Sequence, residues 1–164
     1  MTVPSGGLDC NGPLDALRKI TVEGRKSAPY NCWMSDSPKI TVVDFITVPT
    51  QDVPRSVEFY EGTLGLRKSV YMPERGFAEV ETGNVTITLT NFEQMGMEFH
   101  RNTNPFALHV DDLPAAKSAL EAKGVVFDGD PMDTGVCHMA FFADPDGNPL
   151  MLHSRYAPRV TLQD

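Results

Sequence analysis

The sequence predicts an α+β protein made of two βαβββ modules, and three observations lead to that prediction. Short runs of β-branched and aromatic residues, bounded by glycine, proline, asparagine and aspartate, recur from residue 40 onward and are typical of strands. Between residues 40 and 156, only two stretches place apolar residues near helical spacing. The order strand, helix and three strands over residues 40–92 is repeated over residues 104–156, which indicates a duplicated module.

The first module begins with a strand, because residues 40–48 are rich in β-branched side chains. A helix follows, since Pro54 suits the first helical turn, with either Asp52 or Val53 at the N-terminal cap. Gly62 and Gly65 end this helix. Three strands complete the module, and we expect them at residues 68–72, 76–82 and 85–91.

The second module repeats this order after a linker at residues 92–103. Asp52, Pro54 and Glu61 of the first module correspond at a constant spacing to Asp112, Pro114 and Glu121 of the second. We expect a strand at 105–110, a helix at 113–123, a strand beginning at 125–127, and strands at 136–143 and 149–154. Residues 145–148 are a strong turn signal between the last two strands.

The two ends of the chain fall outside the repeat. Residues 1–39 contain several turn signals, and we expect them to form an N-terminal extension or arm, on the surface or against a partner subunit. Residues 157–164 are expected to be a C-terminal tail. The single domain between them therefore covers residues 40–156.

Composition excludes several classes of protein. With 164 residues, 41% of them hydrophobic and 22% charged, the chain is an ordinary globular protein without a membrane span. Its formal net charge of −8 argues against nucleic-acid binding, which depends on Lys and Arg. The cysteines are odd in number and form no CxxC pair, so we expect free thiols and a cytoplasmic location; they are Cys10, Cys32 and Cys137.

Three segments carry a resemblance to a known family. Residues 52–66 begin Asp-Val-Pro-Arg and end Leu-Gly-Leu, residues 107–125 begin Ala-Leu-His-Val-Asp-Asp-Leu and end Lys-Gly-Val, and residues 141–148 read Phe-Phe-Ala-Asp-Pro-Asp-Gly-Asn. With these segments, the chain resembles the vicinal oxygen chelate superfamily, which includes glyoxalase I, bleomycin-resistance proteins and extradiol dioxygenases. A calcium-binding EF-hand at residues 144–155 is excluded, because its last position is Arg155 instead of glutamate.

The resemblance implies a fold in which each module curls its mixed sheet and paired modules enclose a cup. It also implies a homodimer that pairs modules across subunits. In metal-dependent members the cup holds one divalent ion, bound by His, Glu or Gln on the first and fourth strand of each module. Such an ion needs open positions at which two vicinal substrate oxygens can bind.

The matching positions of this chain do not carry those ligands. They are Phe45 and Pro105 on the first strands, Met151 on the last strand, and Ile87, or Thr88 if the register shifts by one, on the fourth. None of these side chains suits a hard or borderline divalent ion. We therefore predict no metal at the usual position and no other cofactor.

Histidines supply the remaining polar groups of the second module. His109 and His153 should share a face with Pro105 and Met151, because residues two or four apart along a strand point the same way. His138 is a third candidate for the same cluster. These histidines are candidates for a displaced divalent metal site, a general base, ligand contacts or purely structural roles. Catalysis, if present, would fall to His109 and His153.

The sequence leads to two functional hypotheses and a third of lower rank. The first is a protein that binds a small organic molecule in an apolar cup without the usual metal. The second is a glyoxalase-like lyase, isomerase or dioxygenase with a displaced metal or a histidine-based site. The third is a structural or partner-binding module that uses the N-terminal arm. The residues expected to line the cup are Phe45, Thr47, Ile87, His109, His138, Met151, His153, Arg155 and Tyr156.

Overall fold

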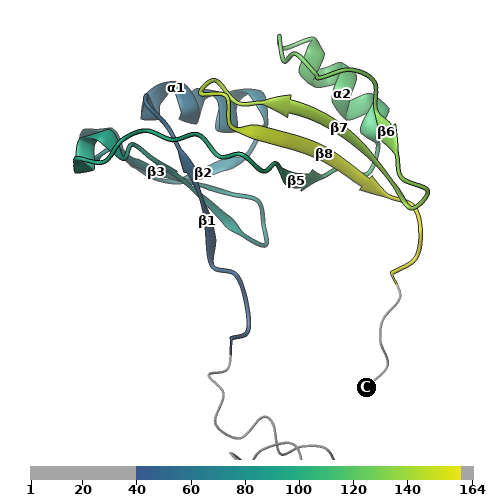
Figure 1. Ribbon diagram of the computed structural model, residues 1–164, viewed down its shortest axis with the longest axis horizontal. Helices are drawn as coiled ribbons and strands as arrows, with labels where there is room; N and C mark the ends of the chain where they lie inside the picture. The colour runs from purple at the N-terminus through teal and green to yellow at the C-terminus, as the bar shows by residue number, and fades with distance from the viewer. Residues whose placement is uncertain (1–39, 160–164) are drawn as a thin grey trace, which may run out of the picture. The chain divides into compact units, whose positions relative to one another are not determined.

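The computed structural model describes residues 40–159, and from Val42 onward these residues belong to one compact unit. Two four-stranded sheets have the orders β1-β4-β3-β2 and β5-β8-β7-β6, and we call them sheet A and sheet B (Figure 1). In each sheet the first strand pairs in parallel with the fourth, and the remaining pairs are antiparallel. The predicted α+β fold with two βαβββ modules is confirmed. The expectations for residues 1–39 and 160–164 lie outside the described residues.

The elements have the following bounds. Sheet A contains β1 (Phe45–Pro49), β2 (Arg67–Met72), β3 (Phe77–Glu81) and β4 (Thr86–Thr90). Sheet B contains β5 (Phe106–His109), β6 (Met132–Asp133), β7 (Cys137–Ala143) and β8 (Pro149–Arg155). The helices are α1 (Val53–Val57), its wider continuation η2 (Glu58–Thr63) and α2 (Leu113–Glu121), and two short turns are η3 (Pro73–Arg75) and η4 (Glu93–Met95).

Both helices begin as the sequence predicts. The Asp52 carboxylate accepts a hydrogen bond from the Arg55 N–H at 3.0 Å, and Asp112 accepts one from the Ala115 N–H at 2.9 Å. Each cap satisfies a backbone donor that the first helical turn leaves without a partner. A proline in the first turn of each helix has the fixed φ angle that the helix needs.

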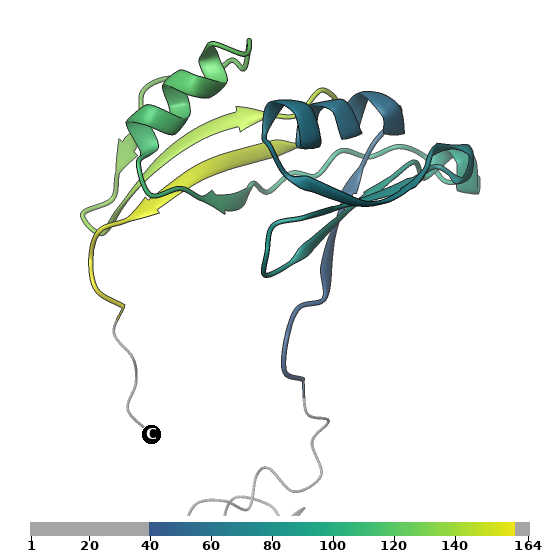
Figure 2. The ribbon, with the colours of Figure 1, turned by 180° about the vertical axis from the view of Figure 1, so that it is seen from behind.

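The helices cover one side of the two sheets, and the opposite, concave side is left open (Figures 1 and 2). Alternate strand residues point toward the helices and form the hydrophobic core, as the period of two along a strand requires. The core residues are Val48, Val53, Val57, Tyr60, Ala78, Val80, Ile87, Leu89, Leu113, Ala140, Phe142, Leu150 and Leu152. None of the helices found in residues 40–159 has the length and apolarity needed to span a membrane.

Two strands differ from the sequence-based expectation. The first strand begins at Phe45 instead of residue 40, because its partner β4 begins only at Thr86 and offers no ladder before that point. The strand expected to begin at 125–127 is reduced to one bridge from Phe127 to Phe142, and β6 forms later, at Met132–Asp133. The intervening residues explain this, because Gly129 has a φ angle of 76° and Pro131 has no N–H for the ladder.

Asn148, in the turn between β7 and β8, joins the two modules. Its side chain is fully buried and donates hydrogen bonds to the Pro49 carbonyl at 2.9 Å and to the Asp144 carboxylate at 2.7 Å. Its Oδ1 accepts a hydrogen bond from the Asn102 N–H at 2.9 Å. One amide thus holds the end of strand β1, the linker and the turn of sheet B together.

Asp146 makes the second connection between the modules. Its side chain is fully buried, accepts hydrogen bonds from Thr50 Oγ1 at 2.6 Å and from Ser56 Oγ at 3.2 Å, and pairs with the Arg55 guanidinium. Every donor comes from the first module, around the start of α1. The Asp-Pro-Asp-Gly-Asn turn is therefore a structural joint.

The Asp144 carboxylate and the Tyr60 hydroxyl complete this joint. Tyr60 donates to Asp144 Oδ2 at 3.2 Å, from the buried side of η2. Burial raises the pKa of Asp144, although the hydrogen bonds from Asn148, Asp146 and Tyr60 oppose that shift. Burial and the neighbouring Asp144 raise the pKa of Tyr60 well above its ordinary value, so the hydroxyl stays protonated and keeps its role as a donor.

Candidate functional site

The concave face of sheet A is polar. Strand register places Thr47, Thr88 and Glu79 in one row across β1, β4 and β3, and Phe45, Thr86 and Glu81 in the next. Thr88 is buried, and its hydroxyl donates a hydrogen bond to Thr47 Oγ1 at 3.0 Å. Hydroxyl and carboxylate groups therefore occupy the centre of this face, where the sequence had predicted an apolar surface.

The two glutamates of β3, Glu79 and Glu81, differ in the hydrogen bonds that their carboxylates accept. Glu81 accepts hydrogen bonds from Ser69 Oγ at 2.6 Å and from Thr86 Oγ1 at 2.9 Å, and these bonds, with Ser69 first, lower its pKa. Within residues 40–159, Glu79 has neither a side-chain hydrogen bond nor an ion pair, and it is only partly exposed. The Glu79 carboxylate is therefore free to meet a cationic group in the cup.

Sequence reasoning missed both glutamates, although a signal for them exists. Ala78 and Val80 are buried under the helices and alternate with Phe77, Glu79 and Glu81. This alternation places every second residue of β3 on the open face. Only the register of the neighbouring strands shows that Glu79 lies beside Thr88.

The concave face of sheet B is mostly apolar and rich in sulfur. One row across its four strands contains His109, His153, Met139 and Met132, and the next contains Ala107, Met151 and Phe141. Phe141, Met139 and Met151 are each partly exposed on this face, while Ala140, Phe142, Leu150 and Leu152 between and beside them are buried. The two halves of the open face thus differ in chemistry.

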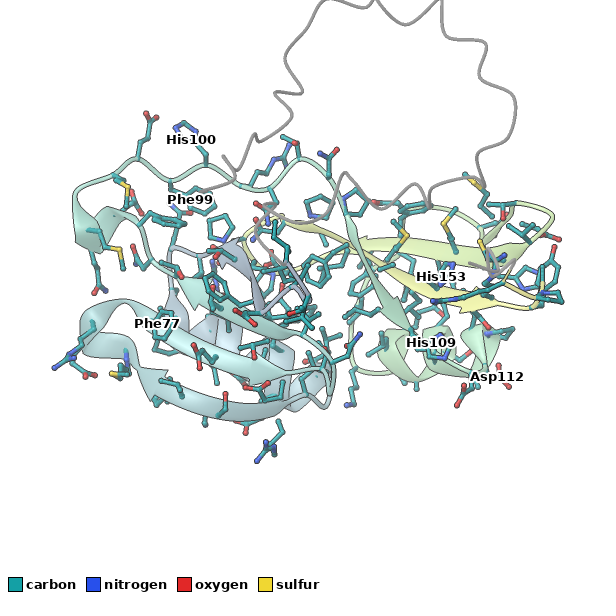
Figure 3. All side chains as sticks on the ribbon, turned by 90° about the horizontal axis from the view of Figure 1, so that it is seen from below. Phe77, Phe99, His100, His109, Asp112 and His153 are labelled. Carbon is teal, nitrogen blue, oxygen red and sulfur yellow. The ribbon has the colours of Figure 1, made fainter. Side chains whose placement is uncertain are left out.

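The structure brings His109 and His153 together. They are direct partners on the parallel strands β5 and β8, and Figure 3 shows their side chains on neighbouring strands. The His109 side chain is 69% exposed, and its Nε2 lies 3.3 Å from Asp111 Oδ1. No side-chain hydrogen bond or ion pair involves His153 within the described part of the chain.

His138 does not join this pair, which corrects the expectation of a three-histidine cluster. It follows Cys137 and precedes Met139 on β7, so its side chain points to the opposite face of sheet B. There its Nε2 lies 3.7 Å from Asp133 Oδ2, and its ring centroid lies 5.0 Å from that of Tyr156.

The two residues expected to close the cup lie at one end of sheet B, where each bonds to a group beside it. Tyr156 donates a hydrogen bond to Asp133 Oδ1 at 2.7 Å, and its ring packs beside the His138 ring. Arg155 lies on the same face as Cys137, at the exposed end of β8, and donates to the Pro158 carbonyl at 3.1 Å. Arg155 thus shares the open face with His153 and Met151 but lies at its end, and Tyr156 is held beside β6.

The four positions at which the resemblance implies a bound metal do not carry a set of metal ligands. The register identifies the position on β4 as Thr88, because Thr88 pairs with Thr47 on the open face and Ile87 belongs to the core. Phe45 and Pro105 have no donor atom in their side chains, and the Thr88 hydroxyl is bonded to Thr47. Met151 alone offers a thioether, a soft ligand. Among residues 40–159, no group of three or more His, Cys, Asp or Glu side chains could hold a metal ion.

A groove lies between the two modules. Its volume is about 690 Å³, and its walls come from the edge strands β1 and β5, the end of η2 and the helix α2. Ile46 and Leu64 contribute from the first module, and Phe106 and Leu120 from the second. Ile87 and His109 also reach this groove. It is mostly apolar.

Comparison with known proteins identifies the family. The model of the Glyoxalase/Bleomycin resistance protein/Dioxygenase superfamily matches residues 42–152. The chain belongs to this superfamily. No curated protein matches this superfamily member closely enough to narrow the assignment further.

Solved structures of similar fold agree with this membership. TnmS3, an antibiotic binding protein from a Streptomyces species, is 25% identical, with a TM-score of 0.62 over 73% of this chain and 100% of that chain. A superfamily member from Sphaerobacter thermophilus is 26% identical, with a TM-score of 0.60 over 71% of this chain and 98% of that chain. A protein from the mobile metagenome of V. Pseudocholerae is 28% identical, with a TM-score of 0.58 over 74% of this chain and 99% of that chain.

Proposed function

We propose that this superfamily member binds a small organic molecule in the cup and leaves it chemically unchanged, without a metal at the family's usual position. The observation that carries the proposal is the set of side chains at that position. Phe45 and Pro105 supply no ligand, Thr88 is bonded to Thr47, and Met151 would act alone. The similarity to an antibiotic binding protein supports the same reading.

The chemistry of the two faces indicates the class of ligand. Phe141 and Met151 on sheet B offer an apolar, polarizable surface suited to an aromatic ring system. Glu79 on sheet A offers a carboxylate without a partner among the described residues, beside the Thr88 hydroxyl. A ligand that satisfies both faces is an aromatic compound that carries a positive charge. The formal net charge of −8 also attracts such a compound.

A thermal-shift comparison tests this proposal. Acridine orange, an aromatic cation, is expected to raise Tm in the presence of EDTA, and anilinonaphthalene sulfonate, an aromatic anion, is expected to have a much smaller effect. At 100 times Kd, binding adds about 2.7 kcal/mol of stability, enough for a shift of about 5 °C or more. Glu79→Gln should weaken acridine orange about tenfold, since a desolvated charge pair contributes more than about 1 kcal/mol.

The control for this experiment is Glu98→Gln. Glu98 lies in the linker and its side chain is 83% exposed, so its substitution should leave the affinity unchanged. Equal shifts by the cation and the anion would contradict the proposed ligand class. A shift that appears only after a divalent ion is added would contradict metal-free binding.

A homodimer belongs to the same proposal. The concave side is open, and Val42, Val43 and Phe45 at its edge are 68%, 62% and 58% exposed. A second copy would cover these apolar side chains and close the cup. Sedimentation equilibrium is therefore expected to give about twice 18.0 kDa, and Val43→Glu should shift the protein toward the monomer. A monomer at all concentrations would contradict the dimer. Val126→Glu, at a valine that is 81% exposed, is the control and should leave the molecular mass unchanged.

The second candidate is a glyoxalase-like lyase, isomerase or dioxygenase. The observation in its favour is that His109 and His153 are direct partners on the open face. An imidazole pair of this kind is suited to act as a general base or to hold a displaced metal. Conversion of a bound compound, abolished by His153→Ala, would favour this candidate over simple binding. The cytoplasmic location and the absence of nucleic-acid partners remain predictions.

A further inference from the structure

The concave face of sheet B carries a row of soft and borderline metal ligands that lies apart from the family's metal position. His109, His153 and Met139 are successive partners across β5, β8 and β7. Met132 on β6 continues the row as the partner of Met139. The family position itself lies in other rows, at Phe45, Thr88, Pro105 and Met151. The row is therefore a separate group of side chains.

We propose that His109, His153 and Met139 bind one monovalent copper ion. Neighbouring strands lie about 4.8 Å apart, so the three side chains span about 10 Å at the backbone. Figure 3 shows His109 and His153 side by side on neighbouring strands of this face, and Met139 is the partner of His153 on the next strand. His153 stands between the other two, which places one ion within reach of all three.

The kinds of atoms in the row select the metal. Two imidazole nitrogens and one thioether sulfur form a neutral ligand set in which the sulfur is soft. Thioethers select Cu(I), whereas Zn²⁺ sites usually have four ligands of nitrogen, oxygen or thiolate. Within residues 40–159, no group of three or more His, Cys, Asp or Glu side chains could hold such an ion, and His138 lies on the opposite face. Cu(I) is stable with three ligands of this type, and the proposal involves no change of oxidation state.

Asp111 supports this arrangement as a positioning residue. Its Oδ1 lies 3.3 Å from His109 Nε2, which leaves Nδ1 of His109 as the nitrogen available to the ion. A carboxylate beside the second nitrogen of a histidine ligand fixes the ring and raises its basicity. Substituting Asp111 with Asn should weaken binding about tenfold, at the low end of the effect of such partners.

A chelator competition tests the site. The full chain with Cys10→Ser and Cys32→Ser, which removes two thiols outside the described residues, is titrated with Cu(I) against bicinchoninate without oxygen. We expect one ion per chain. His153→Ala and Met139→Leu should each weaken Cu(I) at least about tenfold, while Met139→Leu leaves the weak Zn²⁺ affinity of the histidine pair unchanged.

Three control variants separate this site from other ligands. His138→Ala lies on the opposite face, and Met97→Leu lies in the linker, where Met97 is 50% exposed. Cys137→Ala tests the buried thiol on the same face, whose sulfur contacts Thr134 Oγ1 at 3.1 Å. Each of these should leave the Cu(I) affinity within about threefold. Circular dichroism confirms that every variant is folded.

Methionine methyl signals give an independent readout. With Ag⁺ as a redox-inert substitute for Cu(I), the Met139 methyl resonance should shift and that of Met97 should not. The proposal is overturned if the chain binds no Cu(I) with measurable affinity, if His153→Ala leaves the affinity unchanged, or if Cys137→Ala abolishes it. The proposal is also overturned if Met139→Leu weakens Zn²⁺ and Cu(I) equally, because the sulfur would then not select the metal. None of these results depends on the organic ligand.

Discussion

Asn148→Ala is expected to lower the free energy of unfolding by about 3–4 kcal/mol, because the substitution removes three hydrogen bonds that one buried amide makes. The Asp144 carboxylate loses one of its donors, the Pro49 carbonyl loses the amide that donates to it, and the Asn102 N–H loses its acceptor. The side chain is fully buried, so water cannot readily replace the amide. Urea unfolding, followed by circular dichroism, measures the change.

The matched control is Asn104→Ala. Asn104 is exposed shortly before β5, and its substitution should change the free energy of unfolding by no more than about 0.5 kcal/mol. Asn148→Asp is informative as well, since it would place a second carboxylate within 2.7 Å of the Asp144 carboxylate. A cost below about 1 kcal/mol for Asn148→Ala would show that the turn does not hold the modules together.

Met151→Lys is expected to weaken acridine orange at least about 100-fold, which corresponds to about 2.7 kcal/mol. Met151 lies between Ala107 and Phe141 at the centre of the open face of sheet B. An ammonium group there repels a cationic ligand and requires desolvation when an aromatic ring covers it. The fold should persist, since Met151 is only partly buried. Fluorescence titration measures the affinity.

Two variants control for this effect. Met151→Leu conserves volume and apolarity and should keep the affinity within about threefold, because such swaps cost little. Val126→Lys adds the same charge at a position that is 81% exposed, in the connection after α2. If Met151→Lys binds as tightly as the wild type, the ligand does not lie on sheet B.

The sequence predicted the architecture because local signals agreed with the repeat. The caps at Asp52 and Asp112 and the prolines that follow them define both helices. The parallel and antiparallel pairs follow from the repeated order of elements. The start of β1 could not be predicted in this way, because Val42 and Val43 have strand-forming side chains but no partner strand.

The position of a site residue could be predicted only where the spacing along one strand decides on which face of the sheet its side chain lies. His109 and His153 were expected to be close, and the register of β5 and β8 makes them direct partners. To place His138, one must know which residues of β7 lie on the open face of sheet B. The choice between Ile87 and Thr88 required the pairing of β1 with β4. Glu79 is a candidate ligand contact because it pairs with Thr88 across the strands, and no local sequence pattern reveals that pairing.

The role of the Asp-Pro-Asp-Gly-Asn turn also depends on distant contacts. The turn itself is evident from Pro145, Asp146 and Gly147. Its structural role arises because Asp146 and Asn148 bond to residues of the first module, far away in the sequence. Long-range pairs of this kind cannot be derived from local propensity.

Retention of compounds by the full chain tests the central proposal most directly. The protein is incubated with a mixture of aromatic natural products of both charges, in EDTA or with added Mn²⁺ and Zn²⁺, and bound compounds are separated by ultrafiltration and identified by mass spectrometry. We predict that cationic aromatic compounds are retained with unchanged mass and to the same extent in EDTA. Retention that requires the divalent ions, or loss of a compound with appearance of a product, would contradict metal-free binding.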